Sequence, residues 1–379
     1  MSAVNKRTNW NAGRLAVTAL ICAAIGGFEP NAGALTINPI FDSTITSDSN
    51  AGAIETTIRA MCFEYRYRIA DPGVVNITFL EKTSGLGSSY TGGNEGVNVS
   101  YMDYVKALRA HASSAVDTLV TNNLALTVNN PVNGSQTIYL QYALARTLGL
   151  TTKAPASDNT IELNTGSCRI SESDDYGYDF SCFCYTKYSL CPVICHEMDE
   201  CLGFGSALNG KDNGDAAPTG AIQPEDLWRY DQNNARSFTT DVNAQAYFYV
   251  PGLGGVGRFN QTEGGDFGDW YGDGIPRVQN ATGTRDADPR LGDFEMAIFD
   301  IIGYHMMPTP MWFDPTEDSG GNGAYYSAFN KEADAGKATL SGGAILIKNA
   351  HTFHHSRIDS STFSRPVKLV SFDGTRIVP

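Results

Sequence analysis

Positive charge is scarce in this sequence. Its 379 residues include 27 lysines and arginines against 41 aspartates and glutamates, which gives a formal net charge of −14 at pH 7. A chain this acidic repels phosphate backbones, which argues against a nucleic-acid-binding role. Hydrophobic residues make up 42% of the chain, which is typical of a globular protein and too many for a disordered one.

Long hydrophobic runs and several common motifs are also missing. An apolar run at residues 15–28 is shorter than the roughly 20 residues that a membrane-spanning helix needs, and no later segment is long enough. The sequence contains no P-loop, no dinucleotide-binding fingerprint and no G-x-S-x-G elbow. We therefore expect a protein without a membrane span and outside the enzyme classes that these motifs mark.

Residues 1–34 have the pattern of a secretory signal peptide. Lys6, Arg7 and Arg14 supply a positive region, the apolar run follows it, and residues 32–34 form an A-x-A cleavage site. A membrane anchor is the less favoured alternative because the run is short. The sequence thus predicts a secreted, extracellular protein.

The cysteines are few but clustered. Cys22 falls in the signal peptide, and seven others remain: Cys62, Cys168, Cys182, Cys184, Cys191, Cys195 and Cys201. In a secreted chain this cluster favours disulfide bonds, with Cys62 a candidate for the odd free thiol, over a cysteine zinc site that lacks the usual C-x-x-C spacing. Five N-x-S/T sequons would make the protein a glycoprotein in a host that modifies secreted chains; they are Asn76, Asn98, Asn133, Asn260 and Asn280.

Apolar periodicity predicts a mixed α+β chain. Helices are expected over 51–69, over 101–121, around His196 and over 294–302; strands are expected over 35–46, 74–81, 137–142, 160–164 and 246–250. Residues 84–98, rich in Gly, Ser and Asn, are expected to form a loop. The composition changes near Met306, so we expect a domain at 35–306 and a β-rich C-terminal extension of unknown role at 307–379, with strands at 344–347 and 367–372. For the histidines of that extension, His351, His354 and His355, exposed loop positions are favoured over a metal site.

The most informative stretch is residues 193–206, which contains an H-E-x-x-E pattern. On a helix, His196 and Glu200 lie on one face and can bind the same metal ion, while Glu197 is placed to take a proton from a metal-bound water. Apolar neighbours indicate a buried helix, where these groups would be unfavourable without a metal. The alternative is a surface helix with an acidic face. Gly203 would let the chain leave the helix sharply.

This stretch and several others resemble a family of secreted bacterial proteins that are classed as zinc metalloproteases. The resemblance spans about residues 34–305 and is carried by the segments 34–45, 75–79, 196–206, 224–230, 236–239, 246–248, 264–270 and 299–304. It implies a zincin-like, metzincin-like fold, in which a small mixed sheet carries an active-site helix. It also implies a Zn²⁺ cofactor and a protein or peptide substrate.

The segment departs from the metzincin pattern H-E-x-x-H-x-x-G-x-x-H at two positions. Glu200 replaces the second histidine, and Ser206 stands where the third ligand is expected, although a neutral serine binds zinc poorly. A third ligand must therefore come from elsewhere in the chain. The candidates are Asp226 first, then Asp266 and Asp269, and last His305. For Asp226 the alternative is a structural role as a cap or as a partner of Arg229.

The leading hypothesis is a secreted metal-dependent peptidase that hydrolyses peptide bonds through a metal-activated water. His196, Glu200 and Asp226 would bind Zn²⁺, and Glu197 would be the general base. Asp- and Gly-rich loops at 209–219 and 264–274 also allow Ca²⁺, although polar turns are favoured there. The alternative hypothesis is a non-catalytic extracellular binding or structural protein on a degenerate zincin scaffold.

Overall fold

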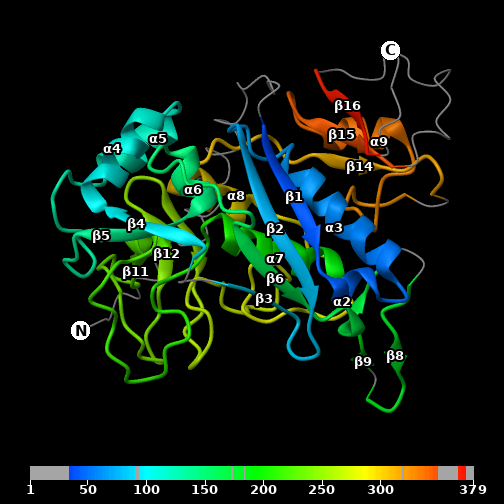
Figure 1. Cartoon of the computed structure of the whole chain (residues 1–379), viewed down its shortest axis with the longest axis horizontal. Coiled ribbons are helices and arrows are strands. Elements are labelled where there is room, and N and C mark those ends of the chain that lie inside the picture. The colour runs from blue at the N-terminus through cyan, green and yellow to red at the C-terminus, as the bar shows by residue number, and fades with distance from the viewer. Residues whose placement is uncertain are drawn as a thin grey trace, which may run out of the picture.

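The computed structural model shows an α+β protein (Figure 1). It describes residues 34–90, 94–171, 174–182, 184–317, 320–348 and 366–372. The predicted signal peptide, apart from its last residue, and the histidines at 351, 354 and 355 lie outside these ranges. None of the helices in the described ranges is long and apolar enough to cross a bilayer.

The principal sheet has the strand order β1-β2-β6-β3. Its strands are β1 (Leu35–Phe41), β2 (Gly73–Glu81), β6 (Asn159–Leu163) and β3 (Gly87–Ser89). β1, β2 and β6 are parallel, whereas β3 runs antiparallel to β6. In β2 the alternating Val75, Ile77 and Phe79 are buried, as the period of two predicts. Within the described residues no further strand pairs with β3, so it forms one edge of the sheet.

Two helices pack together against this sheet. α3 (Ala51–Tyr65) contacts β1, α7 (Leu190–Leu202) contacts β3 and β6, and the two helices contact each other. α3 buries Ile54 and Ile58 one turn apart, as its apolar spacing predicts. α7 is buried over most of its length, which agrees with the prediction of a buried rather than a surface helix. A short helix, α2 (Ser43–Thr46), ends the segment that was expected to be strand up to residue 46.

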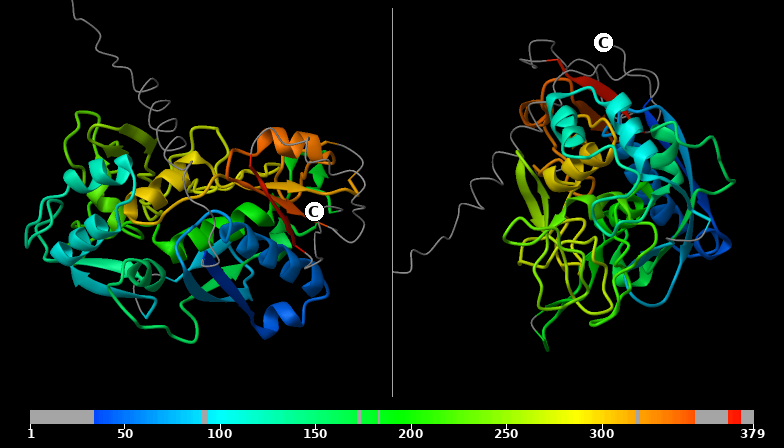
Figure 2. Two further views of the ribbon diagram at one scale, coloured as in Figure 1. Left: turned by 90° about the horizontal axis from the view of Figure 1, so that it is seen from above. Right: turned by 90° about the vertical axis from the view of Figure 1, so that its left-hand side faces the viewer.

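The remaining elements flank this centre (Figure 2). The helices are α4 (Tyr101–His111), α5 (Ala115–Asn122), α6 (Tyr142–Thr147) and α8 (Asp293–Ile302), and the short 3₁₀ turns are η1 (Thr165–Ser167) and η2 (Pro224–Trp228). The paired strands are β4 (Gly96–Ser100) with β5 (Thr137–Gln141), β7 (Cys168–Arg169) with β10 (Tyr188–Ser189), and β8 (Tyr178–Asp179) with β9 (Cys184–Tyr185). A three-stranded sheet contains β11 (Arg229–Tyr230), β12 (Tyr247–Val250) and β13 (Gly254–Arg258).

The segment 101–121, which was expected to be one helix, forms two helices, α4 and α5. The helical conformation is interrupted before Ser114. The side chain of Ser114 accepts a hydrogen bond from the backbone N–H of Asp117 and begins α5 with a capping box.

The C-terminal segment forms a second small sheet. It contains β14 (Met311–Phe313), α9 (Glu332–Ala338), β15 (Ala344–Ile347) and β16 (Lys368–Ser371), with the three strands parallel. Trp312 packs on Phe63 of α3, with ring centroids 6.4 Å apart. Leu346 and Trp312 belong to the same buried cluster as Ile58, so this sheet shares the main core.

The cysteine cluster differs from the disulfide-linked cluster that was predicted. Five cysteines are buried free thiols: Cys62, Cys168, Cys191, Cys195 and Cys201. They pack among core side chains, with the Sγ atom of Cys195 3.6 Å from the Sδ atom of Met61. Burial raises the pKa of the Cys62 and Cys168 thiols to about 12, which disfavours the reactive thiolate. Cys182 is disulfide-bonded. Among the sequons, Asn98 is exposed, whereas Asn260 and Asn280 are buried.

Candidate metal centre

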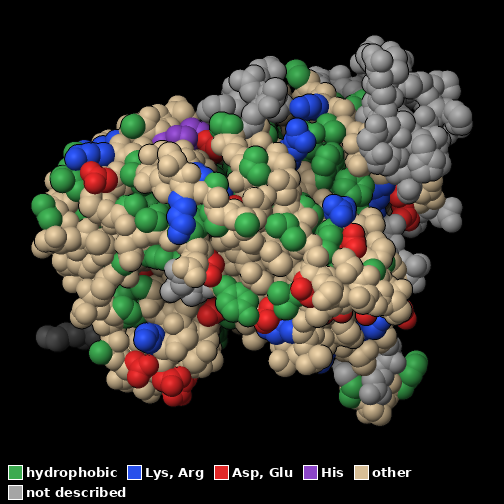
Figure 3. All heavy atoms as spheres, in the orientation of Figure 1, with side chains coloured by type: hydrophobic (Ala, Val, Ile, Leu, Met, Phe, Trp, Pro, Cys, Tyr) green, Lys and Arg blue, Asp and Glu red, His purple; other side chains and the backbone are tan. Residues whose placement is uncertain are grey.

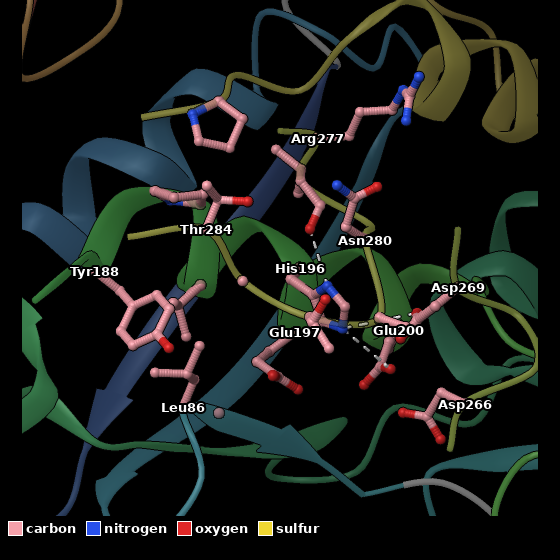
Figure 4. A pocket seen from close by; sticks show the side chains of 18 of the residues that line it. Leu86, Tyr188, His196, Glu197, Glu200, Asp266, Asp269, Arg277, Asn280 and Thr284 are labelled. Carbon is pink, nitrogen blue, oxygen red and sulfur yellow. Dashed lines mark hydrogen bonds and ion pairs between the residues drawn. The ribbon is translucent and has the colours of Figure 1, made fainter. Parts of the chain in front are cut away.

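A pocket of about 430 Å³ lies between β3, α7 and the loops of residues 266–289. β3 contributes Gly87 and Ser89 to its wall, and α7 contributes His196, Glu197 and Glu200. Figure 4 shows these α7 side chains directed into the pocket, opposite the loop that carries Asp266 and Asp269. The pocket therefore joins three parts of the chain that are far apart in sequence.

Three side chains converge in this pocket with the spacing of metal ligands. The Nε2 atom of His196 lies 3.7 Å from Oε1 of Glu200 and 3.7 Å from Oδ1 of Asp269 (Figure 4). One ligand atom from each residue lies within 4.8 Å of the others. The i, i+4 spacing on α7 brings His196 and Glu200 together as the sequence predicts, and Asp269, one of the alternative third ligands, completes the group.

Neighbouring groups fix the orientation of these ligands. The Nδ1 atom of His196 lies 2.9 Å from the carbonyl oxygen of Val278. Because a carbonyl only accepts, Nδ1 carries a proton, and Nε2, which faces the two carboxylates, is the nitrogen that could bind a metal. Ser89 on β3 donates a hydrogen bond of 2.5 Å to Oε2 of Glu200. The hydrogen-bonding partners needed around a metal site are therefore present.

Glu197 lies next to the three ligands and against β3. Its side chain is buried, and a Cβ atom added to Gly87 would lie 2.3 Å from Oε1 of Glu197. Only glycine leaves room for the carboxylate at this point of β3. Sequence patterning does not predict this contact, because residues 84–98 have the composition of a polar loop.

The pocket gathers more negative charge than the protein neutralises. Burial and the nearby Glu200 raise the pKa of both Glu197 and Asp269 well above their usual ranges, and burial also raises the pKa of Asp266. Although burial opposes it, the carboxylates of Glu197 and Glu200 raise the pKa of His196. Arg277 also lines the pocket, but its guanidinium pairs with Asp273 at 2.8 Å. A bound divalent cation would relieve this repulsion.

Asp226, the first choice for the third ligand, does not join this group. Its Oδ1 atom accepts a 2.5 Å hydrogen bond from the hydroxyl of Ser206, and its Oδ2 atom accepts from the backbone N–H groups of Ala207 and Gln223 at 3.0 and 2.8 Å. Both oxygens are thus occupied by protein donors, which is the structural alternative that the sequence left open. Ser206 is therefore a hydrogen-bonding partner of Asp226.

The segment around Asp226 forms hydrogen bonds with two parts of the chain that border the site. Glu225 accepts a 2.8 Å hydrogen bond from the N–H of Gly205, just after α7. Arg229 donates to the carbonyl oxygen of Phe267 at 2.6 Å, within the loop that carries Asp266 and Asp269. Gly203, with φ of 126°, ends α7 in a conformation that favours glycine, as predicted. This segment therefore positions two parts of the site without contributing a ligand.

His305, the last of the alternative ligands, lies in a different group with Asp71 and His111. Its Nδ1 atom lies 2.7 Å from Oδ1 of Asp71, and its Nε2 atom lies 3.0 Å from the carbonyl oxygen of His111. The imidazole of His111 reaches the same Asp71 oxygen at 2.9 Å. Both nitrogens of His305 face acceptors, so this arrangement is a hydrogen-bonded cluster in which His305 offers no free lone pair. Neither of the two candidate metal groups in the described residues contains a cysteine.

Comparison of the chain with protein-family models, with curated proteins and with solved structures finds no match. The geometry of the pocket is therefore the basis for assigning a function.

Proposed function

We propose that the protein is a secreted zinc-dependent peptidase. His196, Glu200 and Asp269 hold Zn²⁺, and Glu197 acts as the general base. The observation that carries the proposal is the convergence of an imidazole nitrogen with two carboxylates, each 3.7 Å from it, in a pocket that the carboxylate of Glu197 also lines. Zn²⁺ held by three protein ligands polarises a carbonyl group and lowers the pKa of water.

The donor set favours zinc over calcium. Histidine nitrogens and carboxylate oxygens both bind Zn²⁺ in proteins, whereas Ca²⁺ takes six to eight oxygen ligands. The Asp-rich loop at 209–219 contributes no residue to either candidate metal group in the described chain. The 264–274 loop contributes Asp269, but to a group that includes His196.

Glu197 is suited to proton transfer by its position and burial. It is adjacent to His196 on α7, it lines the pocket, and it forms no ion pair with a lysine or arginine among the described residues. In the proposed reaction its carboxylate accepts a proton from the attacking water and returns it to the leaving amine.

The zincin-like form of the fold belongs to this proposal. β3 runs antiparallel to its neighbour at the sheet edge that borders the pocket, and α7 lies beneath that edge. An extended peptide can add to such an edge through backbone hydrogen bonds, which would bring its carbonyl groups over His196 and Glu197. Gly87 and Ser89 carry small side chains that would leave the edge accessible.

Metal analysis and peptide hydrolysis test the proposal together. Purified protein is expected to contain about one equivalent of zinc and to cleave unstructured protein substrates. Glu197→Gln should keep the zinc and lose about 10²–10⁴-fold in turnover, because the proton acceptor is removed. Glu200→Gln should lose zinc. Glu263→Gln, a change at an exposed carboxylate, is the matched control and should alter neither quantity.

Two outcomes would contradict the proposal. Full peptidase activity in the Glu197→Gln protein would show that the assigned base is wrong. If carefully purified wild-type protein contains almost no zinc and cleaves no peptide, the alternative of a non-catalytic binding protein on this scaffold is favoured instead.

A further inference from the structure

A second pocket, of about 230 Å³, adjoins the candidate centre. Arg277 lines both pockets, and Figure 4 shows its guanidinium pointing away from His196. Trp270, which directly follows the metal-binding Asp269, also lines the second pocket. The two pockets are therefore neighbours that share Arg277 and the loop that carries Asp269 and Trp270.

The second pocket is lined largely by aromatic rings held in place. Trp270 is buried, and its Nε1 atom donates a 3.2 Å hydrogen bond to Glu295 on α8. A Cβ atom added to Gly257 on β13 would lie 2.8 Å from the Trp270 ring, so glycine is needed there for the ring to pack against the strand. Further aromatic rings and one carboxylate complete the lining: Tyr247, Tyr271, Phe294 and Asp273.

One positive charge in this pocket contacts an aromatic ring and not a carboxylate. The guanidinium of Arg258 stacks on the ring of Tyr271, 3.8 Å from its centroid, and its Nε atom is buried without a hydrogen-bond partner. Across the described residues its side chain forms no ion pair, in contrast to Arg277, which pairs with Asp273. An arginine stacked on an aromatic ring keeps its N–H groups free for a planar anion.

We propose that this pocket, the Arg258 pocket, binds a carboxylate of the substrate and so selects where an acidic residue lies relative to the cleaved bond. The inference rests on the proposed peptidase function. A carboxylate that reaches the second pocket is attracted by Arg258, whereas Asp273 in the same pocket is already paired with Arg277. The two neighbouring pockets therefore favour one register of an acidic peptide over the others. The carboxylate can come from an Asp or Glu side chain or from the peptide C-terminus.

A set of fluorogenic peptides tests which position of the substrate carries the acidic residue. The peptides share one sequence, and each position in turn is replaced by Glu or by its neutral counterpart Gln. At low ionic strength we expect kcat/KM to be about 5- to 10-fold higher for Glu than for Gln at one position on one side of the cleaved bond, the size of a partly exposed ion pair. Peptides ending in an acid or an amide distinguish a C-terminal carboxylate from a side chain. Arg258→Gln should abolish the preference, and Arg258→Lys should restore part of it.

Arg59→Gln is the matched control. Arg59 also stacks on an aromatic ring, that of Phe41 at 4.7 Å, but it lies on α3 and lines neither pocket. This variant should keep the preference for Glu unchanged. Equal rates for Glu and Gln at every position, or a preference that survives in Arg258→Gln, would overturn the proposal.

Binding separates this proposal from the peptidase proposal. Calorimetric titration of the Glu197→Gln protein with the same peptides should show tighter binding of the Glu peptide by a similar factor, lost when Arg258→Gln is added. If this holds while no peptide is ever cleaved, the Arg258 pocket is supported and the peptidase function fails. If peptides are cleaved but Glu and Gln bind alike, the peptidase function stands and the Arg258 pocket is refuted.

Discussion

Two aspartates near α7 show how the surroundings of a carboxylate decide what it does. Both Asp226 and Asp269 are buried in loops that follow the helix. The oxygens of Asp226 accept hydrogen bonds from one hydroxyl and two backbone N–H groups, whereas Oδ1 of Asp269 faces Nε2 of His196 and accepts only a long hydrogen bond, of 3.4 Å, from Gln279. A carboxylate whose two oxygens are filled by protein donors stabilises the fold, and one that faces a histidine ring nitrogen can share a cation with it.

The first prediction compares Asp269→Asn with Asp226→Asn. Asp269→Asn should lower zinc affinity by about 10- to 100-fold or more, because a neutral amide is a poorer ligand, and should leave the metal-free protein folded. Asp226→Asn should keep one equivalent of zinc but lose about 1–3 kcal/mol of unfolding free energy, because buried N–H and O–H donors lose their charged acceptor. Zinc content and urea unfolding measure both effects. Loss of zinc from the Asp226→Asn protein alone would reverse the assignment.

The cluster of Asp71, His111 and His305 provides a prediction on pH. Although burial alone would raise it, hydrogen bonds from His111 and His305 hold the pKa of Asp71 at about 2, and the bond to Asp71 raises the pKa of His305. Asp71 therefore contributes stability above its unfolded pKa of about 3.9, and loses it as the pH falls towards 2. His305 contributes stability below its unfolded pKa of about 6.5, and loses it as the pH rises through its raised folded pKa.

The difference in unfolding free energy between wild type and His305→Gln should therefore be largest between about pH 4 and pH 6.5. The lowered pKa of Asp71 alone corresponds to about 2 kcal/mol of unfolding free energy. Chemical denaturation at a series of pH values, with a chelator present so that zinc does not contribute, measures the difference. A difference that is constant from pH 3 to pH 9 would show that the cluster does not titrate with folding.

At the scale of elements, sequence patterning predicts the helices and strands with strong periodicity and misses the edge of the site. β2 and α3 follow periods of 2.0 and 3.6 residues, and the prediction places both within a few residues of their bounds. β3 has the sequence Gly-Ser-Ser, in which no apolar side chain alternates, so nothing local marks it as a strand. Its pairing with β6 and its contact with α7 hold it in place.

Gly87 on β3 therefore provides the prediction at this scale. Gly87→Ala places a methyl group where Oε1 of Glu197 lies, 2.3 Å from the added Cβ atom, so either the carboxylate or the strand must move. We expect turnover to fall by at least about tenfold while zinc content is unchanged, because the base and not a ligand is displaced. Gly220→Ala, where an added Cβ atom meets nothing within 4 Å, is the matched control. Unchanged turnover in Gly87→Ala would mean that Glu197 is free to adopt another position.

At the scale of the whole molecule, the site is assembled by contacts that the sequence does not encode locally. The H-E-x-x-E spacing predicts two ligands because one helix turn brings them together. Asp269 and Val278 reach His196 only through the fold of the loops behind α7, and the sequence could offer Asp269 only as one acid among several. The distribution of surface charge does not indicate where the site lies either, because positive and negative side chains are interspersed on the face shown in Figure 3.

Glu64 links distant parts of the molecule in a similar way. From α3, its carboxylate accepts a 2.8 Å hydrogen bond from Nε1 of Trp312 in β14 and pairs with Arg68 and Arg290. Although it is buried, these partners hold its pKa below the usual value. The C-terminal sheet, the chain before α8 and the end of α3 therefore meet at one charged group.

Trp312→Phe tests whether this junction holds the C-terminal sheet on the rest of the protein. The change removes the indole N–H that donates to a buried carboxylate, which should cost about 1–3 kcal/mol of unfolding free energy beyond the loss of packing. Trp228→Phe is the matched control, because Trp228 is equally buried but its Nε1 atom has no hydrogen-bond partner, so only packing is lost. Urea unfolding of the two variants isolates the hydrogen bond as their difference. If both variants lose the same free energy, the bond to Glu64 contributes nothing, and the C-terminal sheet is held by apolar packing on Phe63 and its neighbours alone.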